Sequence, residues 1–337
     1  MDAENSLNSN NSESTALMDD IYARRLEGKW VHNGGYQIEE MLGEGGFTTV
    51  WRMRSRDGNY SAGKFFTSDP KHLKYFSREL QLLMRLREFR FEENAKYVMS
   101  YFDHFSYIDF DMQSGITRNY PVIVTNLLGD SVSDLLHHLH RGLSLDVVRR
   151  LMKQLFMGLN FLHSHGIVHG DLKTENLLLT KKIDNISGND DINLCISDLN
   201  SSSFADKITS KMVGTQEYAA PEIVLELGYD YKADIWSCGC ILYELLTDQH
   251  LFSFGDDSSD ESSEGEESGS SYSGSESESE SDSGEGFDWD TNYQHLIMME
   301  QVLGRPPSKF IRGGRDYYNS KGRLKHNPRT DPISLLE

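Results

Sequence analysis

Residues 169–176 combine side chains that suit transfer of a phosphoryl group. The segment reads His-Gly-Asp-Leu-Lys-Thr-Glu-Asn, and a run of three leucines follows it. Asp171 can orient a hydroxyl group and accept its proton, Lys173 can stabilise charge on a moving phosphoryl group, and Asn176 can hold a metal ion. Taken alone, the segment is also compatible with a simple turn in which Asn176 acts as a cap.

A second segment that suits phosphate chemistry is the glycine-rich stretch 43–50, Gly-Glu-Gly-Gly-Phe-Thr-Thr-Val, between two predicted strands. Glycines add no Cβ, so the backbone N–H groups of such a hairpin can approach phosphates. Lys64, on the next predicted strand, can reach the α- and β-phosphates, and Glu79 in the following predicted helix can pair with it. Asp198 ends another apolar run and suits a Mg²⁺ ligand. Each of these features is common in isolation.

Together these segments resemble the motifs of protein kinases, in family order. The catalytic-loop pattern H-R-D-L-x-x-x-N is met at 169–176 except that Gly170 replaces the arginine. The pattern G-x-G-x-x-G-x-V is met at 43–50 except that Thr48 replaces the third glycine. Asp198-Leu-Asn stands where the family has D-F-G. Residues 214–222, GTQEYAAPE, resemble the end of an activation segment, and 234–239, DIWSCG, resemble the helix below the catalytic loop.

The resemblance implies a bilobal α+β fold, a β-rich N-lobe followed by an α-helical C-lobe, and transfer of the γ-phosphoryl group of ATP, with Mg²⁺, to serine or threonine hydroxyls of proteins. A lysine two residues after the aspartate is typical of the serine/threonine branch. Asp171 would be the catalytic base, acting with Lys173, Lys64 and Glu79, and the metal ligands would be Asn176 and Asp198. Thr125 would stand behind the adenine. The residues implied to contact ATP are Leu42, Gly43, Glu44, Gly45, Gly46, Phe47, Val50, Lys64, Asn126 and Leu128.

A narrower resemblance is to the SR-protein kinases and their dual-specificity relatives. It is carried by residues 231–252, YKADIWSCGCILYELLTDQHLF, by 295–310 and 317–327, and by the Leu-Leu-Gly at 127–129. SR-protein kinases usually lack the Ala-Pro-Glu form found at 220–222, so the substrate pocket is expected to differ. That family also continues through further helices, which supply an arginine partner for the glutamate equivalent to Glu222. The sequence is therefore interpreted as a fragment or as a chain with a shortened C-lobe.

The surrounding pattern predicts the elements that position these residues. Strands are expected over 36–42, 49–54, 60–66, 98–105 and 121–125, and helices over 72–86, from Ser144 to before Gly166, over 233–246 and over 292–303. The resulting division is a disordered Asn/Ser-rich tail and lead-in at 1–30, an N-lobe at 31–126, a C-lobe at 127–252, a disordered insert at 253–286 and the rest of the C-lobe at 287–337.

The charge and the amino-acid composition limit the kinds of partner and the compartment that can be expected for this chain. The net charge is −20, and residues 253–286 alone carry 12 acidic and no basic side chains, which leaves a net charge of −8 elsewhere. An acidic body argues against nucleic-acid binding and favours basic protein substrates. No apolar run could span a membrane, and the three cysteines offer no disulfide framework, so an intracellular monomer of the cytoplasm or nucleus is expected.

Two other function classes stay open. A pseudokinase that serves as a nucleotide-binding or scaffold module would keep the same fold, and a small-molecule kinase on a related fold would seldom carry the segment at 214–222. His137, His138 and His140 invite a metal site, but only His137 and His140 share a helix face, so solvated histidines are expected. The acidic insert is interpreted as a flexible polyanion rather than a Ca²⁺ site.

Overall fold

The structure, a computed structural model of the 337-residue chain, describes residues 26–110, 115, 117–186, 192–207, 214–254 and 289–325. The expectations for the N-terminal tail and for nearly all of the acidic insert lie outside these residues. The chain divides into two compact units. The first comprises residues 1–130 and 178–200, and the second comprises 131–177 and 201–337.

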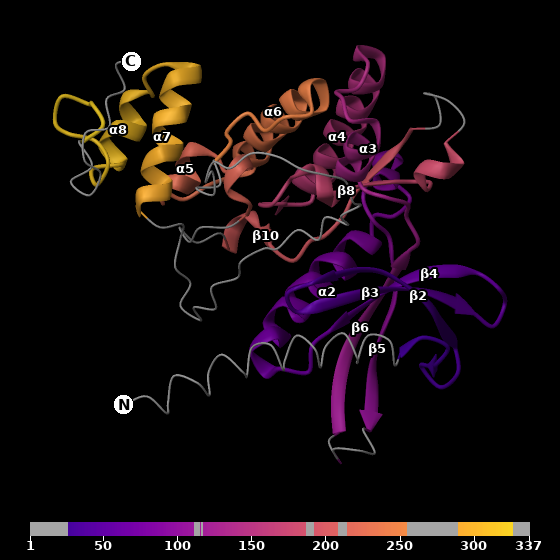
Figure 1. Ribbon diagram of the computed structural model, residues 1–337. Coiled ribbons are helices and arrows are strands. Elements are labelled where there is room, and N and C mark those ends of the chain that lie inside the picture. The colour runs from indigo at the N-terminus through magenta and orange to yellow at the C-terminus, as the bar shows by residue number, and fades with distance from the viewer. Residues whose placement is uncertain are drawn as a thin grey trace, which may run out of the picture. The chain divides into compact units, whose positions relative to one another are not determined.

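The first unit is built on a six-stranded antiparallel sheet in the order β1-β2-β3-β4-β6-β5 (Figure 1). A turn centred on Gly58, whose φ is +82°, joins the third and fourth strands, as the Asp-Gly-Asn sequence predicts. The strands are β1 Trp30–Val31, β2 Tyr36–Gly45, β3 Thr48–Ser55, β4 Tyr60–Phe66, β5 Tyr101–Phe110 and β6 Thr117–Asn126.

Strand alternation separates two faces of this sheet. Phe65 packs into an apolar cluster on one face with Trp51 and Met53 of β3 and Val122 and Val124 of β6. Successive side chains of a strand point to opposite faces. The other face therefore carries Lys64 and its neighbours in register, which are Val50, Ala62, Ile123 and Thr125.

Helix α2, Leu73–Arg87, lies against the sheet and contacts β5 and β6. A short 3₁₀ turn, η1 Pro70–His72, precedes it, and Asp69 caps that turn by accepting a hydrogen bond from the Lys71 backbone. The helix buries Glu79, Leu82, Leu83 and Leu86, while Leu73 and Met84 are 41% and 48% exposed. Leu73 and Met84 therefore lie outside the buried face, although both are apolar.

Residues 178–200 belong to the first unit, although the sequence division places them in the C-lobe. They include most of β8, Leu177–Leu179, which pairs with β9, Leu194–Ile196. Ile196 bridges to Val98, and the Cys195 thiol donates to the Lys96 carbonyl at 3.1 Å. The expected strand at 98–105 begins at Tyr101 instead, because Val98 is engaged by Ile196.

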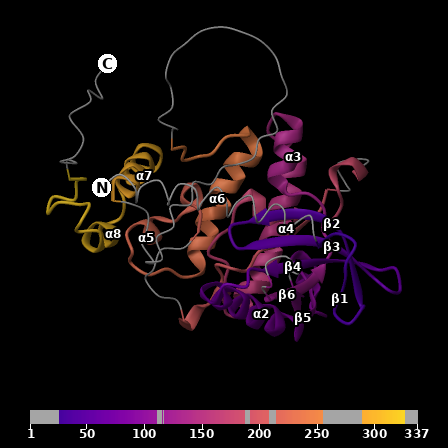
Figure 2. The same ribbon diagram turned by 60° about the horizontal axis from the view of Figure 1, so that its bottom comes forward.

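The second unit is helical around two long helices, α4 Leu145–Ser164 and α6 Tyr231–Thr247, which lie side by side (Figures 1 and 2). The apolar residues of α4 form a buried stripe of Val148, Leu151, Leu155, Leu159 and Leu162. Ser144 is its N-cap residue but makes no side-chain capping bond. The remaining described elements of this unit are α3 Val132–Leu139, β7 Ile167–Val168, η3 Thr174–Asn176, β10 Ser203–Phe204, η6 Ala205–Lys207, η7 Gln216–Tyr218, α5 Pro221–Val224, α7 Trp289–Leu303 and α8 Ser308–Gly313.

Helix α7 contains a buried histidine. His295 is 0% exposed, and its ring packs edge-on against Phe252 at 5.1 Å and Phe254 at 5.2 Å between ring centroids. Neither ring nitrogen has a hydrogen-bond partner within the part of the chain that the structure describes. Burial therefore lowers the pKa of His295 to about 4.

Candidate active site

The glycine-rich segment forms a tight hairpin in the first unit. Gly45 pairs with Thr48, so Gly46 and Phe47 make a two-residue turn between β2 and β3. Thr48 is an ordinary strand residue, so the third glycine of the family pattern is not required here. A Cβ at Gly43 would meet no atom within 4 Å. The chain's own packing thus does not demand this glycine, which leaves room for a ligand to approach the backbone.

Lys64, Glu79 and Asp198 form a charge cluster in the first unit. The Lys64 ammonium lies 3.0 Å from Glu79 Oε2 and 2.8 Å from Asp198 Oδ1. Glu79 is 0% exposed. Burial alone would lower the pKa of Lys64, but the carboxylates of Asp198 and Glu79 outweigh it and raise that pKa above its usual range. Lys64 is therefore held as a cation on the face of the sheet that carries Val50 and Thr125.

The turn at Asp198 differs from the family pattern without losing its carboxylate. Asp198 adopts a left-handed φ of +54°, which aspartate tolerates better than most residues. Asn200 stands where the family has glycine, and it has no positive φ. The unusual backbone conformation therefore falls on Asp198, and position 200 needs no glycine.

Residues 125–129 present backbone groups at the end of β6. The Asn126 N–H donates to the Ser100 carbonyl at 3.1 Å, so the Asn126 group that could bind an adenine is its carbonyl. Thr125 is buried and in register with Ala62. Gly129 is required by sterics, because a Cβ there would lie 2.1 Å from the Lys181 carbonyl oxygen. Leu42 and Glu44 are exposed, and Glu44 is in register with Thr49, on the face opposite Lys64.

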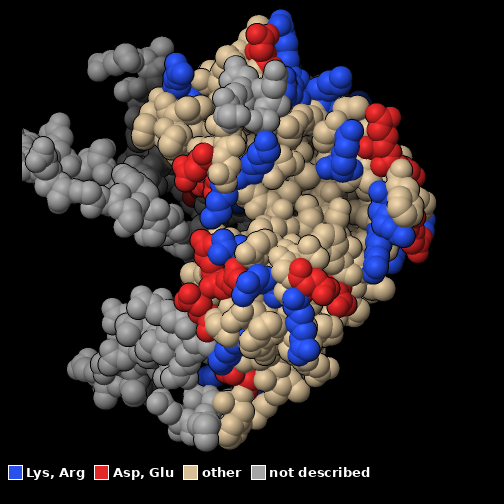
Figure 3. All heavy atoms as spheres, turned by 90° about the vertical axis from the view of Figure 1, so that its right-hand side faces the viewer, with Lys and Arg blue, Asp and Glu red and all other residues tan. Residues whose placement is uncertain are grey.

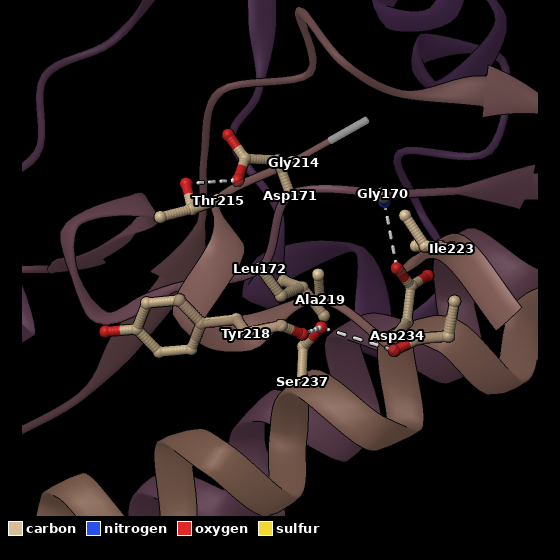
Figure 4. A pocket seen from close by; sticks show the side chains of 11 residues that line it. Gly170, Asp171, Leu172, Gly214, Thr215, Tyr218, Ala219, Ile223, Asp234 and Ser237 are labelled. Atoms are coloured by element: carbon tan, nitrogen blue, oxygen red, sulfur yellow. Dashed lines mark hydrogen bonds between the residues drawn. The ribbon is translucent and has the colours of Figure 1, made fainter. Parts of the chain in front are cut away.

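In the second unit, Asp234 of α6 holds the backbone of the catalytic loop. Its carboxylate accepts a hydrogen bond from the Gly170 N–H at 2.9 Å (Figure 4). It also accepts one from the His169 N–H at 2.9 Å and lies 2.7 Å from Nε2 of His163. Gly170 has a φ of +80°, a conformation that favours glycine. A helix thereby fixes the loop immediately before Asp171.

The side chain of Asp171 is oriented by the segment that begins at Gly214. Thr215 donates its hydroxyl to Asp171 Oδ1 at 2.8 Å (Figure 4). The Asn176 amide donates to the Asp171 carbonyl at 2.8 Å, so the Asn176 amide oxygen is the atom suited to a metal. Gly214 has a φ of +90°, and a Cβ there would lie 2.5 Å from the Gly170 carbonyl oxygen. Lys173 is half-buried at the N-cap of η3.

A buried polar network that sequence reasoning missed ties the same loop to α6. Glu244 accepts a hydrogen bond from the Thr174 hydroxyl at 2.8 Å and one from the Tyr218 hydroxyl at 2.6 Å. All three residues are at least nine-tenths buried. Burial raises the pKa of the Glu244 carboxyl, and the two hydroxyl donors oppose this rise. The only sequence signal was a glutamate among the apolar residues of the ILYELL run at 241–246.

Glu222 lies at a groove of about 570 Å³ in the second unit. Side chains of α5, α6, α7 and α8 line the groove and are mostly apolar, with Trp236, Leu296 and Phe310 among them. Burial raises the pKa of the Glu222 carboxyl.

Other candidate sites are not supported. Within the described ranges no group of three or more His, Cys, Asp or Glu side chains could hold a metal ion, and this includes His137, His138 and His140. All three cysteines are free and buried, and burial raises the pKa of Cys195 to about 11. No helix in the described residues is long and apolar enough to cross a membrane. On the face shown in Figure 3, acidic and basic side chains are interspersed.

The sequence is similar to known protein kinases. The sequence matches the family described as "Protein kinase domain" over residues 36–305. It is 30% identical to "Dual specificity protein kinase lkh1" of Schizosaccharomyces pombe, covering 86% of this chain and 38% of the relative. It is 29% identical to "Dual specificity protein kinase CLK2" of Mus musculus, with 90% and 54% covered, and 26% identical to "Serine/threonine-protein kinase SRPK" of Physarum polycephalum, with 90% and 75% covered. The chain thus spans about half or less of the first two relatives.

Proposed function

The chain belongs to the protein kinase domain family, and from this premise we propose that it transfers the γ-phosphoryl group of ATP to serine or threonine hydroxyls of proteins. The observation that carries the proposal is the Lys64–Glu79–Asp198 cluster. A buried glutamate and a second carboxylate hold one lysine charged, on the sheet face next to the glycine-rich hairpin.

The proposed roles follow from what each side chain contacts. Lys64 binds the phosphates as a fixed cation, and Glu79 keeps it in place. Asp171 accepts the proton of the attacking hydroxyl. Thr215 orients its side chain, and Asp234 holds the backbone just before it. Lys173 stabilises the charge on the moving phosphoryl group.

The residues also suit Mg²⁺. Asp198 supplies a carboxylate that is 37% exposed and Asn176 supplies an amide oxygen, and hard oxygen ligands of this kind are those that Mg²⁺ prefers. When bound, Mg²⁺ would neutralise phosphate oxygens. The backbone carbonyl of Asn126 and the backbone of Leu128 are the proposed adenine contacts, with Leu42 and Val50 as apolar neighbours.

The substrates we propose are basic proteins, with Arg-Ser-rich segments among them. The support is the net charge of −8 outside residues 253–286 and the resemblance to SR-protein kinases. On the face in Figure 3, acidic groups lie beside basic ones. We also propose an intracellular monomer, in the cytoplasm, the nucleus or both, since three buried free thiols suit a reducing compartment.

The test is transfer of label from γ-labelled ATP, with Mg²⁺, to a panel of Arg-Ser-rich, other basic, acidic and proline-directed peptides. Asp171→Ala should lower turnover by roughly 10²- to 10⁴-fold and leave ATP binding intact. Asp146→Ala, at a well-exposed aspartate of α4, is the matched control and should behave as wild type. Turnover of Asp171→Ala equal to that of the wild type would refute the role of Asp171 as the catalytic base. ATP binding without transfer to any peptide would favour the pseudokinase alternative, and a preference for acidic peptides would overturn the proposed substrate class.

A further inference from the structure

The turn of the glycine-rich hairpin is stacked on helix α2. The Phe47 ring lies 4.6 Å from the Tyr75 ring and 5.0 Å from the His72 ring, measured between centroids, at interplanar angles of 25° and 30°. Residues 41–46 of the hairpin are exposed, whereas Phe47 is half-buried by these contacts. The stack therefore fixes a turn whose other residues are open to solvent.

The backbone of the same residue is also held. The Phe47 carbonyl accepts a hydrogen bond from the Thr67 N–H at 3.0 Å. The Thr67 hydroxyl lies 2.6 Å from Nδ1 of His72, whose ring stacks on Phe47. Phe47, Thr67 and His72 thus form a closed ring of contacts, and Tyr75 adds a second aromatic face to it.

Tyr75 also connects this ring of contacts to the charge cluster. It lies four residues before Glu79, so the two side chains occupy the same face of α2. Through Tyr75 the helix contacts the glycine-rich turn, and through Glu79 it contacts Lys64. One helix face therefore fixes two groups assigned to phosphate binding, the turn and the lysine.

We propose that Tyr75 and His72 are positioning residues for the triphosphate, a proposal that rests on the proposed ATP-dependent function. By stacking on Phe47 they restrict the conformations of the turn before ATP arrives. Its backbone N–H groups then lose less conformational freedom when they bind phosphates, and binding is tighter. Because the turn is assigned to the phosphates and not to the adenine, the effect should be confined to ligands that carry the triphosphate.

The experiment measures dissociation constants for Mg²⁺-ATP and for adenosine, with kcat and Tm, for the wild type and four variants. Tyr75→Ala should raise the Kd for ATP about three- to tenfold, the range expected for loss of one aromatic pair. Its Kd for adenosine and its kcat should stay within twofold of wild type. Tyr75→Phe keeps the ring and should restore the affinity for ATP. Phe47→Leu, which keeps apolar bulk but lacks a ring, should match Tyr75→Ala. Met84→Ala, at an exposed position on the same helix, is the control.

The outcomes separate this inference from the function on which it rests. A wild-type chain that binds no ATP would overturn both. Wild-type affinity for ATP in Tyr75→Ala and in Phe47→Leu would overturn the positioning role and leave the kinase assignment standing. Equal losses for ATP and adenosine, accompanied by a lower Tm, would show that the stack only stabilises the fold. Failure of Tyr75→Phe to recover ATP affinity would exclude ring stacking as the cause.

Discussion

Replacing His295 by phenylalanine should remove one cause of the decrease in unfolding free energy of this protein at acidic pH. His295 is buried against Phe252 and Phe254, and neither ring nitrogen is paired in the described residues. Its pKa falls from 6.5 to about 4 on folding, so the unfolded chain binds a proton at this position first. Stability is therefore lost as pH falls below about 6.5, and this contribution levels off below about 4.

The pKa shift from 6.5 to about 4 corresponds to a loss of roughly 3 kcal/mol of unfolding free energy at the acid end of that pH range. Phenylalanine keeps the aromatic contacts but cannot bind a proton. At pH 7 it also relieves two unpaired buried nitrogens, which should add about 1–3 kcal/mol of stability.

The assay is urea unfolding of the wild type and His295→Phe at pH 7, 6, 5 and 4.5. The difference in unfolding free energy between the two proteins should grow as pH falls. His138→Phe, at an exposed histidine of α3, is the control and should leave the pH dependence unchanged. If the difference between His295→Phe and wild type is constant from pH 7 to 4.5, the imidazole is already charged or paired in the folded protein, and the reasoning fails.

Three further predictions concern the site. Glu79→Gln removes the charge that faces Lys64, so KM for ATP should rise. Because Asp198 remains, the unfolding free energy should fall by no more than about 3 kcal/mol, which is the low end for a broken buried ion pair. An unchanged KM would contradict this. Thr215→Val removes the hydroxyl that orients Asp171, so kcat should fall roughly tenfold with KM for ATP unchanged, and a kcat within twofold of wild type would exclude the role. Gly170 offers no charge to a phosphate, so phosphatase treatment should leave kinase activity intact. The idea would be refuted if phosphatase abolished activity and a phosphomimetic residue at position 209 or 210 restored it. Thr209 and Ser210 lie outside the described residues.

The strands could be predicted from the sequence because turn-forming residues separate them and their side chains alternate. The buried face of α2 could not. This helix has leucines at positions 73, 80, 82, 83 and 86, so apolar periodicity alone does not decide which face is buried. Glu79, which contacts Lys64, shares the buried face with Leu82 and Leu86, while Leu73 and Met84 are exposed.

The charged site residues were predictable because the family patterns fix their spacing. The residues that orient them were not. Thr215 reaches Asp171 across 44 positions, and Thr174 reaches Glu244 across 70. No local pattern marks such pairs, since a threonine alone is compatible with a strand, a turn or a surface. The assignment of residues 178–200 to the first unit likewise depends on distant contacts, such as that between Lys64 and Asp198.

The backbone at Gly170 limits how this chain can evolve. An arginine at position 170 is what would let a phosphate in the activation segment control the catalytic loop. Gly170 has a φ of +80°, so any L side chain there is strained, and Gly214, at φ +90°, packs its backbone against the Gly170 carbonyl. A change to arginine would therefore cost about 1–2 kcal/mol of backbone strain while it supplies a regulatory charge. Gaining this form of control by phosphorylation would require the fold to absorb that strain, as it already does at Glu226, whose φ is +53°.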